Sequence, residues 1–274
     1  MAARLQVDPP LLHRLLVNFL REEAGKFGYT RGVVGLSGGV DSALAGYLSV
    51  QAFGAQNVLV VLMPYRTSSP DSVSDAMLLV EEWGGPYQRI EITPMLEPFF
   101  QMNSDMDRRR RGNLMARMRM IVLYDQSAEF GGLVIGTSNK SELLLGYGTL
   151  FGDMASAINP LGDLYKTQIW QVARAWGLPE RIVAKVPTAD LWPEQTDEEE
   201  LGLRYREADQ ILYLLYDERY AEEEVVALGY DPQRVARLAQ LVRQVQFKRI
   251  PPVIAKVSRR TIGHDFLYER DWGQ

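Results

Sequence analysis

The loop Gly35-Leu-Ser-Gly-Gly-Val-Asp-Ser42 has the residue types needed to bind a phosphate chain. It follows a short apolar run and precedes a helical pattern, so the helix N-terminal N–H groups and the hydroxyls of Ser37 and Ser42 face one anion site. Its two adjacent glycines allow the backbone to approach a ligand closely. Asp41 alone would repel a phosphate, and is better explained as the ligand of a cation that in turn holds the phosphate.

This string differs from two common nucleotide-binding loops. It contains neither the Gly-Lys-Ser/Thr of a Walker loop nor the G-x-G-x-x-G of a dinucleotide fold. A tight turn that only caps a helix remains the alternative to a phosphate site.

Two more charged residues belong near this loop. Glu142, like Asp41, comes just after a predicted strand, and the carboxyl ends of parallel strands form the ligand crevice of an open α/β sheet. Two carboxylates that converge there repel each other unless a divalent cation lies between them. The alternative for Glu142 is an exposed acid at a helix N-terminus. Lys166 opens a predicted helix, where its charge opposes the helix dipole unless an anion such as triphosphate compensates.

The elements that must position these residues alternate along the first two thirds of the chain. Apolar runs predict strands at 33–36, 58–63, 87–92 and 133–135. Helical periodicity with glycine and proline stops predicts helices at 9–25, 43–53, 72–83 and 113–130. This order predicts an α/β fold with a doubly wound parallel sheet flanked by helices.

The last third of the chain is predicted to be helical. Helices are expected at 166–176, after the capping box Thr196-x-x-Glu199, and near 205–216 and 232–247. The acidic run from Asp197 to Glu200 is interpreted as first-turn charge and not as a metal cluster. We therefore expect a single domain over 1–274, with a nucleotide-binding core at about 1–160 and a helical part with a basic tail at about 161–274.

Composition excludes several classes of function. The chain has 274 residues, of which 46% are hydrophobic, and a net charge of -5, which gives no basic surface for nucleic acid. It has no cysteine, so disulfides, thiol nucleophiles and cysteine metal sites are excluded, and its two histidines disfavour a histidine-rich metal centre. No segment resembles a signal peptide or a membrane span, which makes the cytoplasm the expected location.

The phosphate loop resembles the pyrophosphate loop of the ATP pyrophosphatases, which cleave ATP between the α and β phosphates and adenylate an acceptor. Further segments are similar, in order and spacing, to the NAD synthetase family over roughly residues 9–270. These segments are Ala116–Met120, Gly136–Glu142, Gly146–Asp153, Asn159–Lys166, Pro187–Leu191 and Gln195–Gly202. The resemblance implies an adenine nucleotide alpha hydrolase-like fold.

The same resemblance implies a role for individual residues. Asp41 and Glu142 would bind Mg²⁺, Lys166 would be catalytic, and Asp153 is the candidate for handling ammonia. The residues expected to bind ATP are Gly35, Leu36, Ser37, Gly38, Gly39, Val40, Asp41, Ser42, Thr137, Lys166 and Thr188. Those expected to bind deamido-NAD are Arg117, Phe247 and Lys248.

The implied reaction is the amidation of deamido-NAD to NAD by ammonia, through an adenylated intermediate, with release of AMP and pyrophosphate. The family forms homodimers with dinucleotide sites between subunits, so a homodimer is expected. The chain has neither the length nor the thiol of a glutaminase domain, so it would use ammonium, and a separate glutaminase partner is left open. The alternatives are another ATP pyrophosphatase acting on a different acceptor and a nucleotide-sensing module on the same fold.

The chain departs from many ammonia-dependent relatives at two substrate contacts. Leu150 stands where they have Lys, and Ala157 where they have Asp, so we expect Arg117 and Lys248 to meet the charge of the dinucleotide. The helix that carries Arg117 is apolar nearly all round and is expected to be buried, so its arginines need partners. An internal salt bridge is the alternative for Arg117. The run 108–111 is predicted to be a solvated loop.

Overall fold

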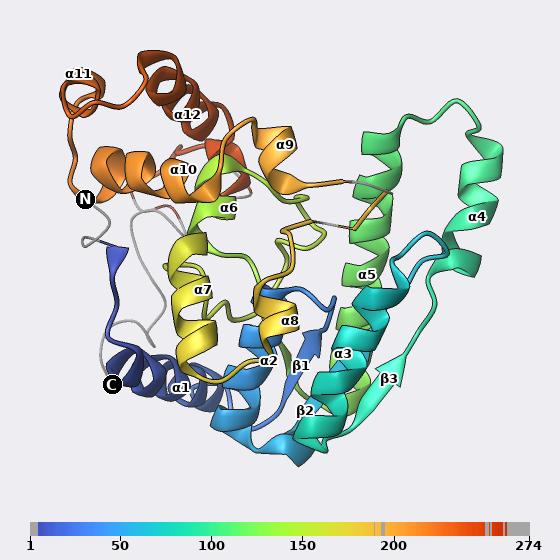
Figure 1. Ribbon diagram of the computed structural model, residues 1–274. Coiled ribbons are helices and arrows are strands. Elements are labelled where there is room, and N and C mark those ends of the chain that lie inside the picture. Colours follow the sequence, from blue (N-terminus) through green and yellow to red (C-terminus); the bar gives the residue numbers. More distant parts are fainter. Residues whose placement is uncertain are drawn as a thin grey trace.

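The computed structural model describes residues 5–188, 190–192, 195–249, 252, 254–259 and 261. Its centre is a four-stranded sheet in the order β3-β2-β1-β4, with every pair of neighbours parallel. The strands are β1 (Gly32–Gly35), β2 (Val58–Leu62), β3 (Tyr87–Arg89) and β4 (Leu133–Val134). Helices cover both faces of this sheet (Figure 1), so the predicted doubly wound parallel sheet is confirmed.

Successive side chains along each strand point to opposite faces of the sheet, so the strands contribute to two hydrophobic cores, one on each face. Val34, Val60 and Leu62 face one side, which is covered by α1 (Pro9–Gly25), α2 (Val40–Phe53), α3 (Pro70–Trp83), α7 (Lys166–Ala175) and α8 (Glu180–Val183). Val33 and Val61 face the other side, where α4 (Thr93–Met102) and α5 (Arg108–Phe130) pack. Because both faces are buried, the strands are apolar runs rather than alternating ones.

A third core holds the helical part of the chain together. The elements around it are α6 (Lys140–Leu145), α9 (Asp197–Leu201), α10 (Tyr205–Leu212), α11 (Glu222–Ala227) and α12 (Pro232–Gln244). A single π turn, Tyr213–Asp217, continues α10, and short 3₁₀ turns lie at Ala55–Asn57 and Gln246–Lys248. In Figure 1 this part lies above the sheet, beyond the head of the β1 arrow.

The predicted elements are found, with differences at their ends. β3 stops at Arg89, and α4 was missed because Pro94 and Pro98 obscure its helical pattern. The prediction of a solvated loop at 108–111 is wrong, since these arginines form the first turn of α5 and Asp107 caps it by accepting from the Arg110 N–H at 2.8 Å. The short helices α6 and α11 were also not predicted, because six residues show too little periodicity.

The expectation that α5 is buried holds for only part of its surface. Met115 and Ala116 are buried, but Ile121 and Tyr124 are 54% and 40% exposed in the single chain.

No helix in the described part of the chain combines the length and apolar character needed to cross a membrane.

Candidate active site

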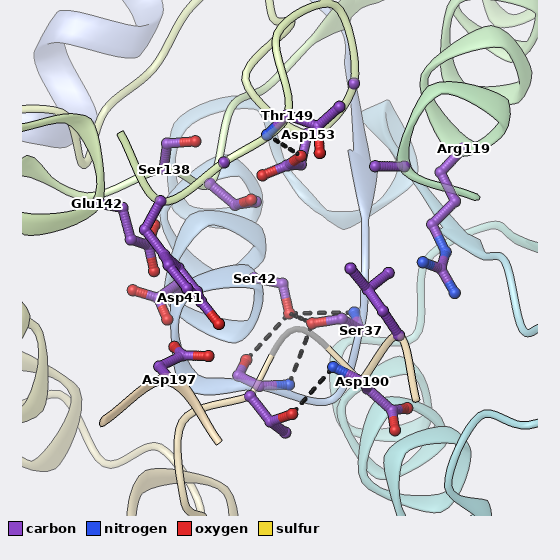
Figure 2. A pocket seen from close by; sticks show the side chains of 18 of the residues that line it. Ser37, Asp41, Ser42, Arg119, Ser138, Glu142, Thr149, Asp153, Asp190 and Asp197 are labelled. Carbon is purple, nitrogen blue, oxygen red and sulfur yellow. Dashed lines mark hydrogen bonds between the residues drawn. The ribbon is translucent and has the colours of Figure 1, made fainter. Parts of the chain in front are cut away.

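A cavity of about 970 Å³ lies at the carboxyl edge of the sheet, where the phosphate loop, α5, α6 and α9 meet (Figure 2). Most of the predicted ATP-binding residues line it: Gly35, Leu36, Ser37, Gly39, Val40, Asp41, Ser42, Thr137, Lys166 and Thr188. The opening at this edge follows from the parallel sheet, because all of its strands end there.

The phosphate loop is held by hydrogen bonds between its own residues. The Ser37 N–H donates to Ser42 Oγ at 3.1 Å, the two hydroxyl oxygens lie 3.0 Å apart, and Ser42 Oγ donates to the Gly39 carbonyl at 3.0 Å. Figure 2 shows Ser37 and Ser42 to the right of Asp41. Gly39 is the N-cap of α2 and offers no side chain, so the first N–H groups of this helix are left for an anion.

Gly38 does not line the cavity, and its role is structural. Its φ is +78°, and a Cβ there would lie 2.2 Å from the Ser72 carbonyl oxygen. Only glycine fits such a position, because the left-handed conformation and the close approach to α3 both exclude a side chain. Gly38 therefore shapes the loop and contributes no group that faces the ligand.

Asp41, Glu142 and Lys166 meet beside this loop. Lys166 Nζ lies 2.5 Å from Asp41 Oδ2 and 3.6 Å from Glu142 Oε1. Lys166 is 3% exposed, and Asn139 Nδ2 donates to the other oxygen of Asp41 at 2.9 Å. A capping box at the start of α6 fixes Glu142, because its Oε2 accepts from the Asn139 N–H at 3.1 Å.

The charges in this cluster depend on each other. Burial and the neighbouring Asp41 carboxylate raise the pKa of Glu142, while Lys166 lowers it. Burial alone would lower the pKa of Lys166, but Asp41 and Glu142 outweigh it and raise that pKa. Lys166 is therefore an ammonium group, and the two carboxylates converge on a single positive charge.

The donor set of Asp41 and Glu142 suits Mg²⁺. Within the described ranges, no three His, Cys, Asp or Glu side chains are grouped to hold a metal. Mg²⁺ commonly takes one or two protein carboxylates and completes its shell with phosphate oxygens and water. Two carboxylates beside a phosphate loop meet this requirement, and their mutual repulsion would be relieved by a divalent cation.

Asp197 is a site residue that sequence reasoning did not assign. The capping box at Thr196 is present, and Asp197 to Glu200 do lie in the first turn of α9. Asp197 itself is only 3% exposed, points toward Asp41 in Figure 2, and accepts a hydrogen bond from the Tyr205 hydroxyl at 3.4 Å. The spacing of a capping box gives no sign of this, since it does not show which first-turn acid turns inward.

Asp153 lines the cavity, and Figure 2 shows it beside Thr149. Its Oδ1 accepts a hydrogen bond from the Thr149 N–H at 2.8 Å. Burial raises the pKa of the Asp153 carboxyl. Arg119 donates to the Met63 carbonyl at 3.1 Å, and burial lowers its pKa. Thr188, which also lines the cavity, accepts from the Asp190 N–H at 3.0 Å.

Arg117 does not line this cavity. Its Nε donates to the Leu150 carbonyl at 3.3 Å, and among the described residues it has no salt bridge, so the alternative of an internal ion pair is not what the structure shows. Leu150 and Ala157 are also absent from the wall. Phe247 and Lys248 do line the cavity, and Lys248 Nζ donates to the carbonyls of Gly146 and Gly148 at 2.7 and 2.8 Å.

Comparison with known proteins gives the family of the chain. The chain matches the NAD synthase family over residues 12–252. It is 53% identical to the NH(3)-dependent NAD(+) synthetase of Trichlorobacter lovleyi, covering 99% of this chain and 100% of that protein. The corresponding protein of Chlorobaculum tepidum is 51% identical, with 98% and 97% covered.

Two solved structures are also similar along the chain. The NMN synthetase of Francisella tularensis has a TM-score of 0.81 and 30% identity, with 92% of this chain and 100% of that chain covered. The NH3-dependent NAD synthetase of Campylobacter jejuni, solved with a nitrate ion, has a TM-score of 0.78, 34% identity and the same coverage. On its sequence and its fold, the chain belongs to the NAD synthase family.

Proposed function

We propose that this chain is an ammonia-dependent NAD synthetase, which uses ATP to convert the nicotinate carboxylate of deamido-NAD into an amide. The observation that carries the proposal is the convergence of Asp41, Glu142 and Lys166 beside the phosphate loop. A carboxylate is a poor electrophile, and adenylation gives it a leaving group. The site supplies what adenylation requires, namely a place for the departing pyrophosphate.

In the first step the substrate carboxylate attacks the α-phosphorus of ATP, and the bond to the β-phosphate oxygen breaks. The N–H groups of the phosphate loop and the Lys166 ammonium stabilise the negative charge that develops on pyrophosphate. Asp41 and Glu142 would hold Mg²⁺, which neutralises charge on the phosphates when bound. The serine hydroxyls of the loop orient the polyphosphate, so this step depends on positioning more than on proton transfer.

In the second step ammonia attacks the acyl carbon and AMP leaves. Asp153 is the proposed acceptor for the proton that the nitrogen must lose. Its carboxyl lines the cavity, where the Thr149 N–H donates to Oδ1. An acid beside the acyl carbon can both hold ammonium and take up its proton.

The dinucleotide site is proposed to lie between two subunits. Arg117 does not line the cavity of its own chain, and the exposed side chains of Ile121 and Tyr124 follow it on α5. A second copy packed on this helix would receive Arg117 beside its own substrate. Lys248 would act from the same chain, either on the dinucleotide directly or by holding the segment 146–153.

One assay tests the proposal. Purified protein is given deamido-NAD, ATP, Mg²⁺ and ammonium, and NAD, AMP and pyrophosphate are measured. All three should form in equal amounts, and omission of ammonium should stop NAD formation. Pyrophosphate release with another acceptor only would identify a different ATP pyrophosphatase, and nucleotide binding without turnover would identify a sensor.

A second acceptor belongs in the same assay. The similar fold of an NMN synthetase, together with Leu150 and Ala157 in place of two charged contacts, makes the mononucleotide a relevant competitor. The carboxylate precursor of NMN should be amidated at least about tenfold less efficiently than deamido-NAD, since it lacks the adenylate half that contributes binding energy. The reverse order would assign the mononucleotide as the substrate.

A further inference from the structure

Asp209 is a buried carboxylate that no step above uses. It lies in α10 and is 0% exposed. Tyr205, Ala208, Ile211 and Leu212 are buried on the same helix, so Asp209 interrupts an apolar face. Burying a charged group in such a place costs free energy unless the group is fully hydrogen-bonded. The hydrogen-bond partners of Asp209 therefore indicate its role.

Both oxygens of Asp209 accept hydrogen bonds from the starts of two other helices. Ser141 Oγ, in the first turn of α6, donates to Oδ1 at 2.6 Å. The Thr167 N–H, in the first turn of α7, donates to Oδ2 at 2.8 Å. Ser141 Oγ also accepts from the Lys166 N–H at 2.9 Å, so one network joins all three helices.

The N-terminus of α7 is capped only in part by its own residues, because Gln168 Oε1 accepts from the Tyr165 N–H at 2.9 Å and reaches no N–H within the helix. Its N-cap residue, Tyr165, makes no side-chain cap bond. The N–H groups of Lys166 and Thr167 are satisfied instead by Ser141 and Asp209, from α6 and α10. The negative charge of Asp209 also offsets the unfavourable position of the Lys166 cation at the positive end of a helix.

The network fixes the two helices whose functional side chains must meet. Ser141 precedes Glu142 in α6, and Thr167 follows Lys166 in α7. Lys166 Nζ and Glu142 Oε1 are 3.6 Å apart, although the chain between them contains a long irregular connection. A shift of either first turn would therefore move the cation away from the carboxylates.

We propose that Asp209 is a positioning residue, which acts through Ser141 and the backbone of α7 to hold Lys166 and Glu142 against the polyphosphate. This inference rests on the proposed function only in placing a polyphosphate beside Lys166. A carboxylate is required because two N–H or O–H donors face it, and an asparagine side chain offers only one acceptor oxygen.

The experiment compares Asp209→Asn, Ser141→Ala and the double variant with the wild-type full chain. Binding of inorganic pyrophosphate by calorimetry is measured beside kcat and the KM for ATP and for ammonium. Each single variant should bind pyrophosphate about fivefold or more weakly and lose about tenfold or more in kcat. The KM for ammonium should stay within about twofold, and the losses of the two single variants should not multiply in the double variant.

Ser49→Ala is the matched control for the loss of a buried hydroxyl. Ser49 is 0% exposed, donates to the Ala45 carbonyl at 2.7 Å within α2, and does not line the cavity. Its variant should lose thermal stability and keep both pyrophosphate affinity and kcat. Loss of activity in proportion to unfolding, in this control and in the test variants alike, would mean that Asp209 has only a structural role.

Other outcomes are equally decisive. Variants that fold and keep pyrophosphate affinity and kcat within about twofold would overturn the proposal, and multiplicative losses would overturn the route through Ser141. If Asp209→Asn does not fold, Ser141→Ala decides alone. A wild-type chain that binds pyrophosphate but forms no NAD would refute the proposed function, while the calorimetric comparison would still test Asp209.

Discussion

A single ammonium group holds two carboxylates together at the centre of the site. Lys166 is shared between Asp41 and Glu142, and all three lie at ends of elements that are far apart in sequence. Removing one partner of a buried ion pair leaves the other charge uncompensated. Because Lys166 has two partners, loss of either carboxylate still leaves it one ion pair.

Replacement of Glu142 by Ala should therefore affect catalysis more than folding. We expect pyrophosphate release to fall about a hundredfold or more, since the leaving group loses one of the carboxylates that would bind Mg²⁺. Asp41→Ala should behave in the same way. Stopped assays for pyrophosphate, with circular dichroism melts as the folding control, check both, and near-normal turnover in Glu142→Ala would remove it from the site.

Asp209 predicts a dependence of stability on pH. Burial raises its pKa from 3.8 to about 6, although hydrogen bonds from Ser141 and Thr167 lower it. Between these two values the folded protein binds a proton that the unfolded chain does not, so this group contributes more stability as the pH falls through the window. The full change is about 3 kcal/mol.

Urea unfolding of the wild type and of Asp209→Asn at pH 7 and pH 5 measures this pH-dependent contribution of Asp209 to stability. The variant cannot titrate at position 209, and other groups titrate alike in both proteins. The difference in unfolding free energy, wild type minus variant, should rise toward pH 5. A difference that stays constant or falls would show that the carboxyl of Asp209 has an ordinary pKa.

At the scale of elements, Lys248 connects the segment after α6 to the turn that follows α12. Its Nζ donates hydrogen bonds to the carbonyls of Gly146 and Gly148. Gly146 has a φ of +64°, and a Cβ there would lie 2.5 Å from the Val245 side chain. This contact also places Lys248 at the cavity wall, near the Asp153 carboxylate.

Lys248→Ala should raise the requirement for deamido-NAD more than tenfold and leave ATP affinity little changed. A desolvated charged contact is worth roughly 2–5 kcal/mol, and loosening of segment 146–153 would act in the same direction. Initial rates with each substrate varied in turn give the two values. Normal binding of deamido-NAD by the variant would exclude the C-terminal tail from the substrate site.

At the scale of the whole molecule, α5 leaves an apolar surface uncovered. We expect a symmetric homodimer packed on this helix, because Ile121 and Tyr124 are exposed and Arg117 does not line the cavity of its own chain. Light scattering at micromolar concentration should give twice the chain mass. Ile121→Asp should shift the mass toward the monomer and lower NAD formation at the same time.

Leu228→Asp is the control for this test. Leu228 is 42% exposed at the end of α11, on the opposite side of the molecule from α5 (Figure 1). The same kind of substitution there should leave mass and activity unchanged. A monomeric wild type, or an Ile121→Asp variant that stays dimeric and active, would contradict an interface on α5.

The sequence by itself determined the parallel sheet, the phosphate loop and the presence of most predicted ATP-binding residues on the cavity wall. These features depend on local pattern: apolar runs of strand length, a glycine-rich string between strand and helix, and charged residues just after strand ends. Since parallel strands end at one edge, Asp41 and Glu142 could be placed together without coordinates. Short helices such as α6 were missed because they have too few residues to show a period.

Only the tertiary structure decided which way individual side chains turn. Asp197 is a first-turn acid of α9, as expected, and is also buried against Tyr205. Arg117 belongs to a predicted motif and does not line the cavity. Asp209 could have been suspected, because it interrupts the apolar face of a strongly amphipathic helix. Its partners could not, since Ser141 and Thr167 lie 68 and 42 residues away and meet it only where three helices pack together. Contacts of this kind depend on long-range packing, which no local pattern records.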